Sequence, residues 1–70
     1  MRKRQITRHG DFEIATAIAA TGGYVAWGKM GRIIGGNPID EPGGQVWFDF
    51  GDTRDEARER VLKEIGLLDR

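Results

Sequence analysis

The feature that most constrains the fold of this 70-residue chain is the start of a helix at residues 53–56, Thr-Arg-Asp-Glu. Threonine is a favourable N-cap, and a glutamate three residues later can bond back to a free backbone N–H, which makes a capping box. Apolar residues then recur at helical spacing, and a glycine at position 66 is a stop signal. We therefore predict a helix over residues 53–65. Its apolar stripe is Ala57, Val61, Leu62, Ile65 and Leu68.

The residues before this helix predict a strand over 45–50. Aromatic and β-branched residues are concentrated there, and the side chains of a strand alternate between its two faces. By this alternation one face carries Val46, Phe48 and Phe50, and the other carries Trp47 and Asp49. The first face is the more apolar, so we expect it to meet the helix.

Two further β-type runs flank Gly22-Gly23 and predict a hairpin. Residues 12–20 alternate, with Phe12, Ile14 and Ile18 on one face, and residues 24–34 form the second run. A short helix over 12–20, with Asp11 as its N-cap, is the alternative interpretation. We prefer the strand, because the Gly-Gly turn is followed by a clear β segment.

Residues 35–44 contain four Gly and both Pro of the chain, which is typical of a turn-rich loop. Ile39 is the only large apolar side chain in it that can pin the loop to a core. We therefore expect an exposed, mobile loop.

These elements predict one α+β domain over residues 11–70, a three-stranded antiparallel sheet with one C-terminal helix on a face (β-β-β-α). A chain of 70 residues has room for a single core. On the sheet, the residues expected to face the helix are Phe12, Ile14, Ile18, Val46, Phe48 and Phe50. The opposite face is expected to show Trp27 and Trp47. So small a core with spare aromatic surface also predicts a homodimer.

Residues 1–10 form a basic leader in this interpretation. Residues 1–9 hold four basic and no acidic residues, whereas residues 10–70 hold seven basic and eleven acidic ones. Such asymmetry is one sign of an arm that touches nucleic acid, with Arg2, Lys3, Arg4 and Arg8 as the candidates. The alternative is a basic terminus, or a first strand, whose charges face water.

The residue types present argue against catalysis and against a bound metal or cofactor. The chain has neither Cys nor Ser, so the usual acyl-transfer nucleophiles and thiolate zinc ligands are absent. The single His9 follows Arg8 in the leader, where we expect it to be exposed. Asp49, Asp52 and Asp55 straddle a strand end and a helix start, so we do not expect them to converge on a metal. No apolar run is long enough for a membrane span, and the lack of Cys fits a cytoplasmic protein.

Two motifs resemble the HicB-like antitoxin domain. They are Gly23-Tyr24-Val25-Ala26-Trp27 on a strand and Gly51-Asp52-Thr53-Arg54-Asp55-Glu56-Ala57 at the helix start. The resemblance implies a truncated RNase-H-like α+β unit, here a solitary domain without the DNA-binding domain of many members. It also implies a binding protein that oligomerises and neutralises a small HicA-like toxin by covering it. It carries no catalytic residue over to this chain.

We therefore expect a non-enzymatic protein-binding module whose contact candidates are Trp27, Trp47 and Tyr24. A nucleic-acid-binding protein that uses the basic leader and exposed Trp side chains for stacking is one alternative. An inhibitor encoded by a mobile element is another, because a compact blocker of another machine needs no active site.

Overall fold

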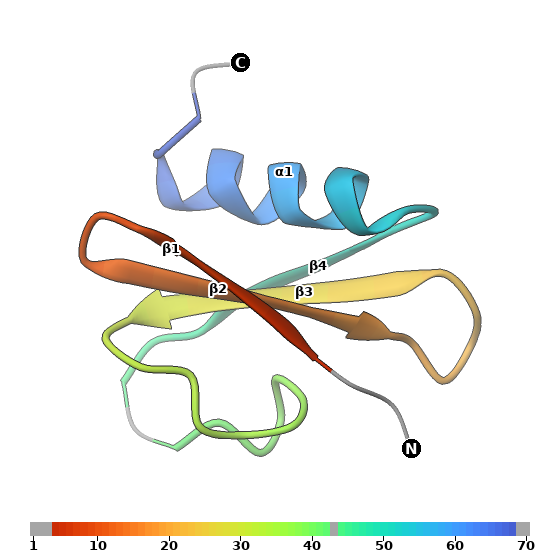
Figure 1. Ribbon diagram of the computed structural model, residues 1–70, viewed down its shortest axis with the longest axis horizontal. Helices are drawn as coiled ribbons and strands as arrows, with labels where there is room; N and C mark the ends of the chain where they lie inside the picture. Colours follow the sequence, from red (N-terminus) through yellow and green to blue (C-terminus); the bar gives the residue numbers. More distant parts are fainter. Residues whose placement is uncertain (1–3, 43, 69–70) are drawn as a thin grey trace.

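The computed structural model describes residues 4–42 and 44–68 and contains four β-strands followed by one α-helix. The strands form one antiparallel sheet in sequence order, and the helix covers one of its faces (Figure 1). The α+β class and the C-terminal helix are confirmed, and the sheet has one strand more than predicted. The elements are β1 (Gln5–His9), β2 (Phe12–Ile18), β3 (Tyr24–Met30), β4 (Trp47–Gly51) and α1 (Arg54–Ile65).

The additional strand, β1, corrects the prediction of a leader over residues 1–10. Its five residues pair with β2, from Gln5 opposite Thr16 to His9 opposite Phe12. The two strands are joined by a two-residue turn in which Gly10 has a positive φ of 63°. Strand pairing gives the backbone of β1 its hydrogen-bond partners, which a free leader would lack. Residues 1–3 lie outside the described part of the chain.

The strand interpretation of residues 12–20 is confirmed, and the helix alternative is wrong. Strand β2 is paired on both sides, with β1 and with β3. The turn to β3 is closed by hydrogen bonds from Ala19 N to Gly23 O (3.0 Å) and from Gly22 N to Ala19 O (3.1 Å). Gly23 has a φ of 70°, and a Cβ there would lie 2.8 Å from the carbonyl oxygen of Gly51. Only glycine fits this position.

The helix begins at the predicted cap. Thr53 Oγ1 accepts a hydrogen bond from Glu56 N at 3.1 Å. The returning bond of the predicted capping box is displaced by one residue, because Glu56 Oε1 accepts from Asp52 N (2.7 Å) instead of from the cap. At the other end Gly66 has a φ of 100°, and its N–H donates to the carbonyls of the last turn. Both helix ends are therefore satisfied by local chemistry.

Between sheet and helix lies a core of buried side chains. Its members are Ile14, Ala26, Ala57, Val61 and Leu62, with the half-buried Tyr24, Trp47, Ile65 and Leu68 packed against it. Gly28 of β3 lies directly beneath the helix, where a Cβ would approach Ile14 Cδ1 to 2.5 Å and Val61 Cγ1 to 3.2 Å. The missing side chain lets the helix approach the sheet closely.

The predicted face of β4 is wrong. Gly28 is the register partner of Trp47, and Trp27 is the partner of Phe48. Trp47 therefore lies on the helix side, where its ring meets the edge of Phe12 at a centroid distance of 5.9 Å. Val46, Phe48 and Phe50 lie on the opposite face. Trp47 packs against the core cluster between sheet and helix, so the pairing register and not the overall hydrophobicity of a face decides which side chains of β4 meet the helix.

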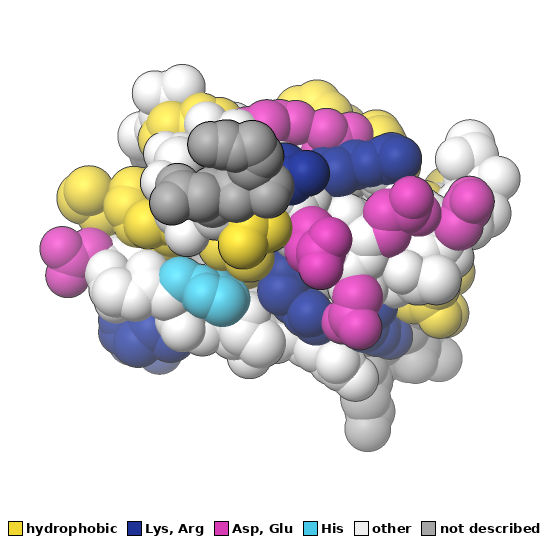
Figure 2. Space-filling model, turned by 90° about the horizontal axis from the view of Figure 1, so that it is seen from above, with side chains coloured by type: hydrophobic (Ala, Val, Ile, Leu, Met, Phe, Trp, Pro, Cys, Tyr) yellow, Lys and Arg dark blue, Asp and Glu magenta, His cyan; other side chains and the backbone are white. Residues whose placement is uncertain are grey.

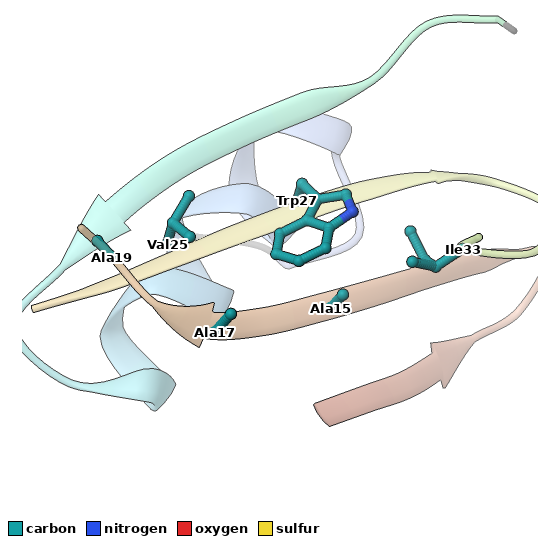
Figure 3. Close-up of a cluster of buried hydrophobic side chains, with 6 residues drawn as sticks. All are labelled: Ala15, Ala17, Ala19, Val25, Trp27 and Ile33. Carbon is teal, nitrogen blue, oxygen red and sulfur yellow. The ribbon is translucent and has the colours of Figure 1, made fainter. Parts of the chain in front are cut away.

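A second cluster of buried side chains lies on the sheet face opposite α1, here called the open face. It consists of Ala15, Ala17, Ala19, Val25, Trp27 and Ile33 (Figure 3). Residues 31–42 and 44–46, here called the covering loop, run beneath this face in Figure 1. Trp27 has no exposed surface at all. A side chain predicted to be on the surface is thus the largest member of a second core.

A buried carboxylate fastens the covering loop to the sheet. Glu41 accepts hydrogen bonds from the backbone N–H groups of Ile34 (2.8 Å) and Gly35 (2.9 Å), which belong to the loop itself. It also accepts from Trp27 Nε1 and Lys29 Nζ of β3, both at 3.3 Å. The expectation that only Ile39 can pin the loop is wrong, because the anchor is a charged side chain.

These donors keep Glu41 ionised. Burial raises the pKa of a carboxyl group, but the two backbone N–H groups, Trp27 and Lys29 together outweigh it and hold the pKa of Glu41 below its ordinary value. A fully desolvated carboxylate with four donors is stable only as long as these donors stay in place.

The outer face of α1 is charged. Seen from the helix side, acidic and basic side chains lie next to one another over this face (Figure 2). Two ion pairs link them, Asp55 with Arg58 (2.8 Å) and Glu56 with Arg60 (3.3 Å). No helix within the described residues has the length and apolar character needed to cross a membrane.

Replacing the cap tests the start of the helix. We expect Thr53→Ala to lower the free energy of unfolding by about 1 kcal/mol, because one N–H of the first turn loses its acceptor. In a domain of this size that corresponds to a fall in Tm of about 4–8 °C. Thr21→Ala, an exposed threonine in the β2–β3 turn, is the control and should leave Tm unchanged. Equal melting curves for the two variants would place the start of the helix elsewhere.

Replacing the loop anchor tests the second core. We expect Glu41→Gln to lower the free energy of unfolding by about 2–4 kcal/mol, because the amide has no charge and turns its NH₂ group toward N–H donors. Because the folded-state pKa of Glu41 is lowered, its contribution is complete above the unfolded pKa and is lost as pH falls. The free energy of unfolding of the wild type, measured with urea, should therefore fall below about pH 4.5. The part of this pH dependence that comes from Glu41 should be missing from the variant.

Exposed Glu59→Gln on α1 is the matched control and should unfold like the wild type at neutral pH. A Glu41→Gln variant of wild-type stability would show that the loop is held by its other contacts, the apolar side chains and the hydrogen bond from Ile33 N to Glu13 Oε1.

Candidate protein-binding groove

An apolar groove of about 730 Å³ opens on the part of the open face that the covering loop leaves free. Ala17, Ala19 and Val25 line it and are themselves buried, with an exposed fraction of 7% each. Their short side chains leave a hollow between the surrounding loop and strands. The other lining residues are Arg4, Ile18, Ala20, Gly36, Asn37, Pro38, Ile39, Val46, Phe48 and Phe50.

The groove is bordered by large apolar side chains that lie in solvent. Ile39 at the tip of the covering loop is 92% exposed, and Phe48 and Phe50 of β4 are 52% and 48% exposed. The two phenylalanine rings contact each other edge to face, with their centroids 6.2 Å apart. Several large apolar side chains around one hollow are characteristic of an interaction surface, whereas isolated ones are ordinary.

One positive charge lies at the groove. Arg4, immediately before β1, is the only charged residue among the described residues that line it. Within the described residues, no acidic side chain forms an ion pair with Arg4. The groove therefore combines an apolar surface with a guanidinium group that is available for a carboxylate.

Polar groups close the backbone of β4 beside the groove. Phe50 N donates to Asp49 Oδ1 (2.8 Å), and Phe50 O accepts from Arg60 of α1 (2.6 Å). Both backbone groups of this edge residue are thus satisfied within the chain. An edge strand whose N–H and C=O groups are occupied is a poor template for a further strand.

Asp49 also belongs to a pair of carboxyl groups. Its hydrogen bond with Glu64 of α1 is the main reason that the pKa of Glu64 is raised to about 7, and burial and the negative charge of Asp49 add to the effect. The same hydrogen bond, the N–H of Phe50 and the charge of Arg60 hold the pKa of Asp49 below its ordinary value. Near neutral pH the proton is therefore held by Glu64 of the helix, while Asp49 of the strand stays ionised and accepts its hydrogen bond.

The predicted partner-binding residues do not form one surface. Trp27 is fully buried and cannot touch a partner in this structure. Trp47 lies on the other side of the sheet, where it lines a smaller hollow of about 390 Å³ with Phe12 and Met30. Tyr24 is half-buried beneath the guanidinium group of Arg54, which lies 4.9 Å from the ring centroid. The prediction of a shared tryptophan face is wrong, because the register of β4 separates the two indoles.

The basic candidates for nucleic-acid binding have separate surroundings. Arg8 lies 3.7 Å from Glu13, and Arg4 lies at the groove. Arg2 and Lys3 are outside the described residues. His9 Nε2 and Thr7 Oγ1 form a hydrogen bond of 3.0 Å. The described residues contain no group of three His, Asp or Glu side chains placed to hold a metal ion.

The groove itself was missed in the sequence. Phe48 and Phe50 were identified as apolar but assigned to the core, and Ile39 was identified as a possible anchor. A signal is present in the sequence, because residues 15 and 17 of β2 and residue 19 directly after it are all alanine. A sheet face with only small residues leaves a hollow or a site for another element.

The raised pKa of Glu64 predicts that the stability of the fold depends on pH. A raised carboxyl pKa in the folded state stabilises the fold below the unfolded pKa of about 4.5, and this contribution is lost as pH rises through about 7. We expect Glu64→Gln, which keeps a donor for Asp49, to match the wild type at pH 5 and to be the more stable protein at pH 8. Urea unfolding at pH 5 and pH 8 measures the free energy of unfolding of both proteins. If the variant differs from the wild type by the same amount at both pH values, Glu64 and Asp49 do not interact as described.

The comparisons with known proteins give no relative for this chain. No family model matches it, and neither a curated protein nor a solved structure matches it. The resemblance to the HicB-like domain therefore rests on the two motifs alone.

Proposed function

We propose that this chain is a non-enzymatic protein-binding module that takes up a segment of a partner protein in the apolar groove. The observation that carries the proposal is the exposure of Ile39, Phe48 and Phe50 around one hollow of about 730 Å³. Burying such side chains yields about 25 cal/mol per Å² of apolar surface, which is the main favourable contribution in most protein associations.

The groove favours one kind of segment. Apolar side chains on the segment would fill the space above Ala17 and Val25, and an acidic side chain would reach Arg4. A helix that presents one apolar stripe fits this description. A strand added to β4 fits less well, because the backbone groups of Phe50 are already bonded.

An antitoxin-type role is the specific form of this proposal. The motifs at residues 23–27 and 51–57 resemble the HicB-like domain, whose partner is a small HicA-like toxin. The observed succession of antiparallel strands and one C-terminal helix is compatible with that domain. Regulation or neutralisation of a small protein partner, and a cytoplasmic location, belong to the same proposal.

Nucleic-acid binding through the basic residues has weaker support. Trp27 has no exposed ring for a base to stack on, and Arg8 already faces Glu13. The chain as a whole has equal numbers of acidic and basic residues. Specific binding of phosphate backbones relies on several unpaired cations, which the described residues do not gather.

Two isoleucines of the same loop allow a matched test. Ile39 lines the groove and is 92% exposed, whereas Ile34 is 65% exposed and does not line it. The partner would be isolated from the source cells with the tagged full chain, identified and produced separately. We expect Ile39→Asp to weaken its binding at least about tenfold in calorimetry, since a charge then faces a desolvated apolar contact.

Ile34→Asp should bind with an affinity close to that of the wild type. Equal affinities of the two variants would show that the partner binds elsewhere. Capture of nucleic acid in place of a protein, with no effect of either substitution, would contradict the proposed function itself.

A further inference from the structure

The two edges of the sheet are unequal. Hydrogen bonds from Ala19 N to Gly23 O and from Gly31 N to Asp11 O show that the odd-numbered residues of β2 bond to β3. Because bonding alternates along an antiparallel strand, its even-numbered residues bond to β1. With the register of Thr7 opposite Ile14, the residues of β1 whose N–H and C=O groups point away from the sheet are Ile6 and Arg8.

These outward groups have no partner among the described residues. At the opposite edge, Asp49 and Arg60 occupy the N–H and C=O of Phe50. Strand β1 has no such protection, no proline and no bulge in its register. Phe48, the other outward-facing residue of β4, has no such partner among the described residues, so the β4 edge is occupied at one of its two outward positions. On β1 both outward positions are open to a further strand.

From this contrast we infer that a second copy of this chain pairs with the open edge, β1 against β1 in antiparallel orientation, around a two-fold axis at Thr7. This register places Ile6 opposite Arg8 of the partner copy, and Arg8 opposite Ile6. The outward-pointing backbone groups of both copies then meet as hydrogen-bonded pairs. The result is one continuous eight-stranded sheet.

The side chains and charges suit this register. No two like charges lie directly opposite each other, because each Arg8 meets an isoleucine and has Glu13 of its own chain 3.7 Å away. Arg4 lies opposite Gly10 of the partner copy, next to the exposed Asp11. A shift by two residues would instead bring Arg8 opposite Arg8, so the charges specify the register as well as the partner.

Such a dimer leaves the proposed function intact. Opposed residues of an antiparallel pair point to the same side of the sheet, so both helices lie on one side and both grooves on the other. The inference does not rest on the groove, because β1 pairing depends on backbone groups of residues 6 and 8. Loss of partner binding would leave it standing.

Backbone and side-chain contributions can be separated at one position. Arg8→Pro removes an outward N–H, whereas Arg8→Ala keeps it and removes only the side chain. Sedimentation equilibrium of the wild type and of Arg8→Ala should give twice the 7.8 kDa mass of one chain. Arg8→Pro should give the single-chain mass. A single-chain mass for the wild type, or an unchanged dimer of Arg8→Pro, would overturn the inference.

The absence of cysteine from the chain provides a second test that does not depend on the proline variant folding. At the two-fold axis, Thr7 meets Thr7 as a non-hydrogen-bonded pair, with Cα atoms about 4.5 Å apart, which suits a disulfide. Thr7→Cys should cross-link under oxidised glutathione. In Gln5→Cys the two thiols are about 13 Å apart along the strands, and it should stay uncrosslinked. Equal cross-linking of the two variants would overturn the proposed register.

Discussion

The buried carboxylate of Glu41 is the interaction on which the open face depends. Without the four hydrogen bonds to Glu41, the covering loop would keep the apolar contacts of Ile33 and Val46 with the sheet. Two further hydrogen bonds would remain, from Ile33 N to Glu13 Oε1 (2.8 Å) and from Lys29 Nζ to the carbonyl oxygen of Pro42 (3.0 Å). A charge without exposed surface is normally a liability, and here the backbone N–H groups of Ile34 and Gly35 offset its desolvation. The same bonds hold the loop on which Ile39 is exposed at the groove. Stability and the candidate binding surface therefore share one anchor.

In this small domain the two faces of the sheet are covered by different elements, one by the helix and the other in part by a loop. One helix is enough to cover the face around Ile14 and Gly28, because the glycine lets it approach closely. A second helix is absent from the described residues, and a loop with one charged anchor takes its place over Trp27. The loop covers only part of the open face. The alanines of β2 leave the remainder as a hollow, so incomplete coverage and the binding surface have the same origin.

What the sequence predicts well is local. The cap at Thr53, the stop at Gly66 and the hairpin at Gly23 follow from chemistry within a few residues, and the structure confirms them. The predicted face of β4 is wrong because it depends on the register with β3, whose residues are distant in sequence. The sequence offers strand β1 only as an alternative to a leader, because Ile6 is its only large apolar residue. Glu41 gives no periodic signal at all, since a buried acid in a Gly/Pro-rich loop resembles a solvated one. The groove is lined by residues of β4, by residues of the loop that Glu41 anchors and by Arg4 before β1. Because the sequence does not predict the arrangement of these segments, it does not predict the groove either.

Each surface of the sheet now has a distinct character. The helix face carries two ion pairs, and on the β4 edge Asp49 and Arg60 occupy the backbone groups of Phe50. Exposed apolar side chains gather at the groove, and unpaired backbone groups lie at β1. Apolar surface attracts partners with little directional preference, whereas a strand edge accepts only an extended chain in register. A partner segment at the groove and a second copy at β1 would therefore be recognised by different interactions on non-overlapping backbone. Arg4 precedes β1 and lines the groove. Among the described residues it is the one placed next to both the groove and the proposed β1–β1 contact.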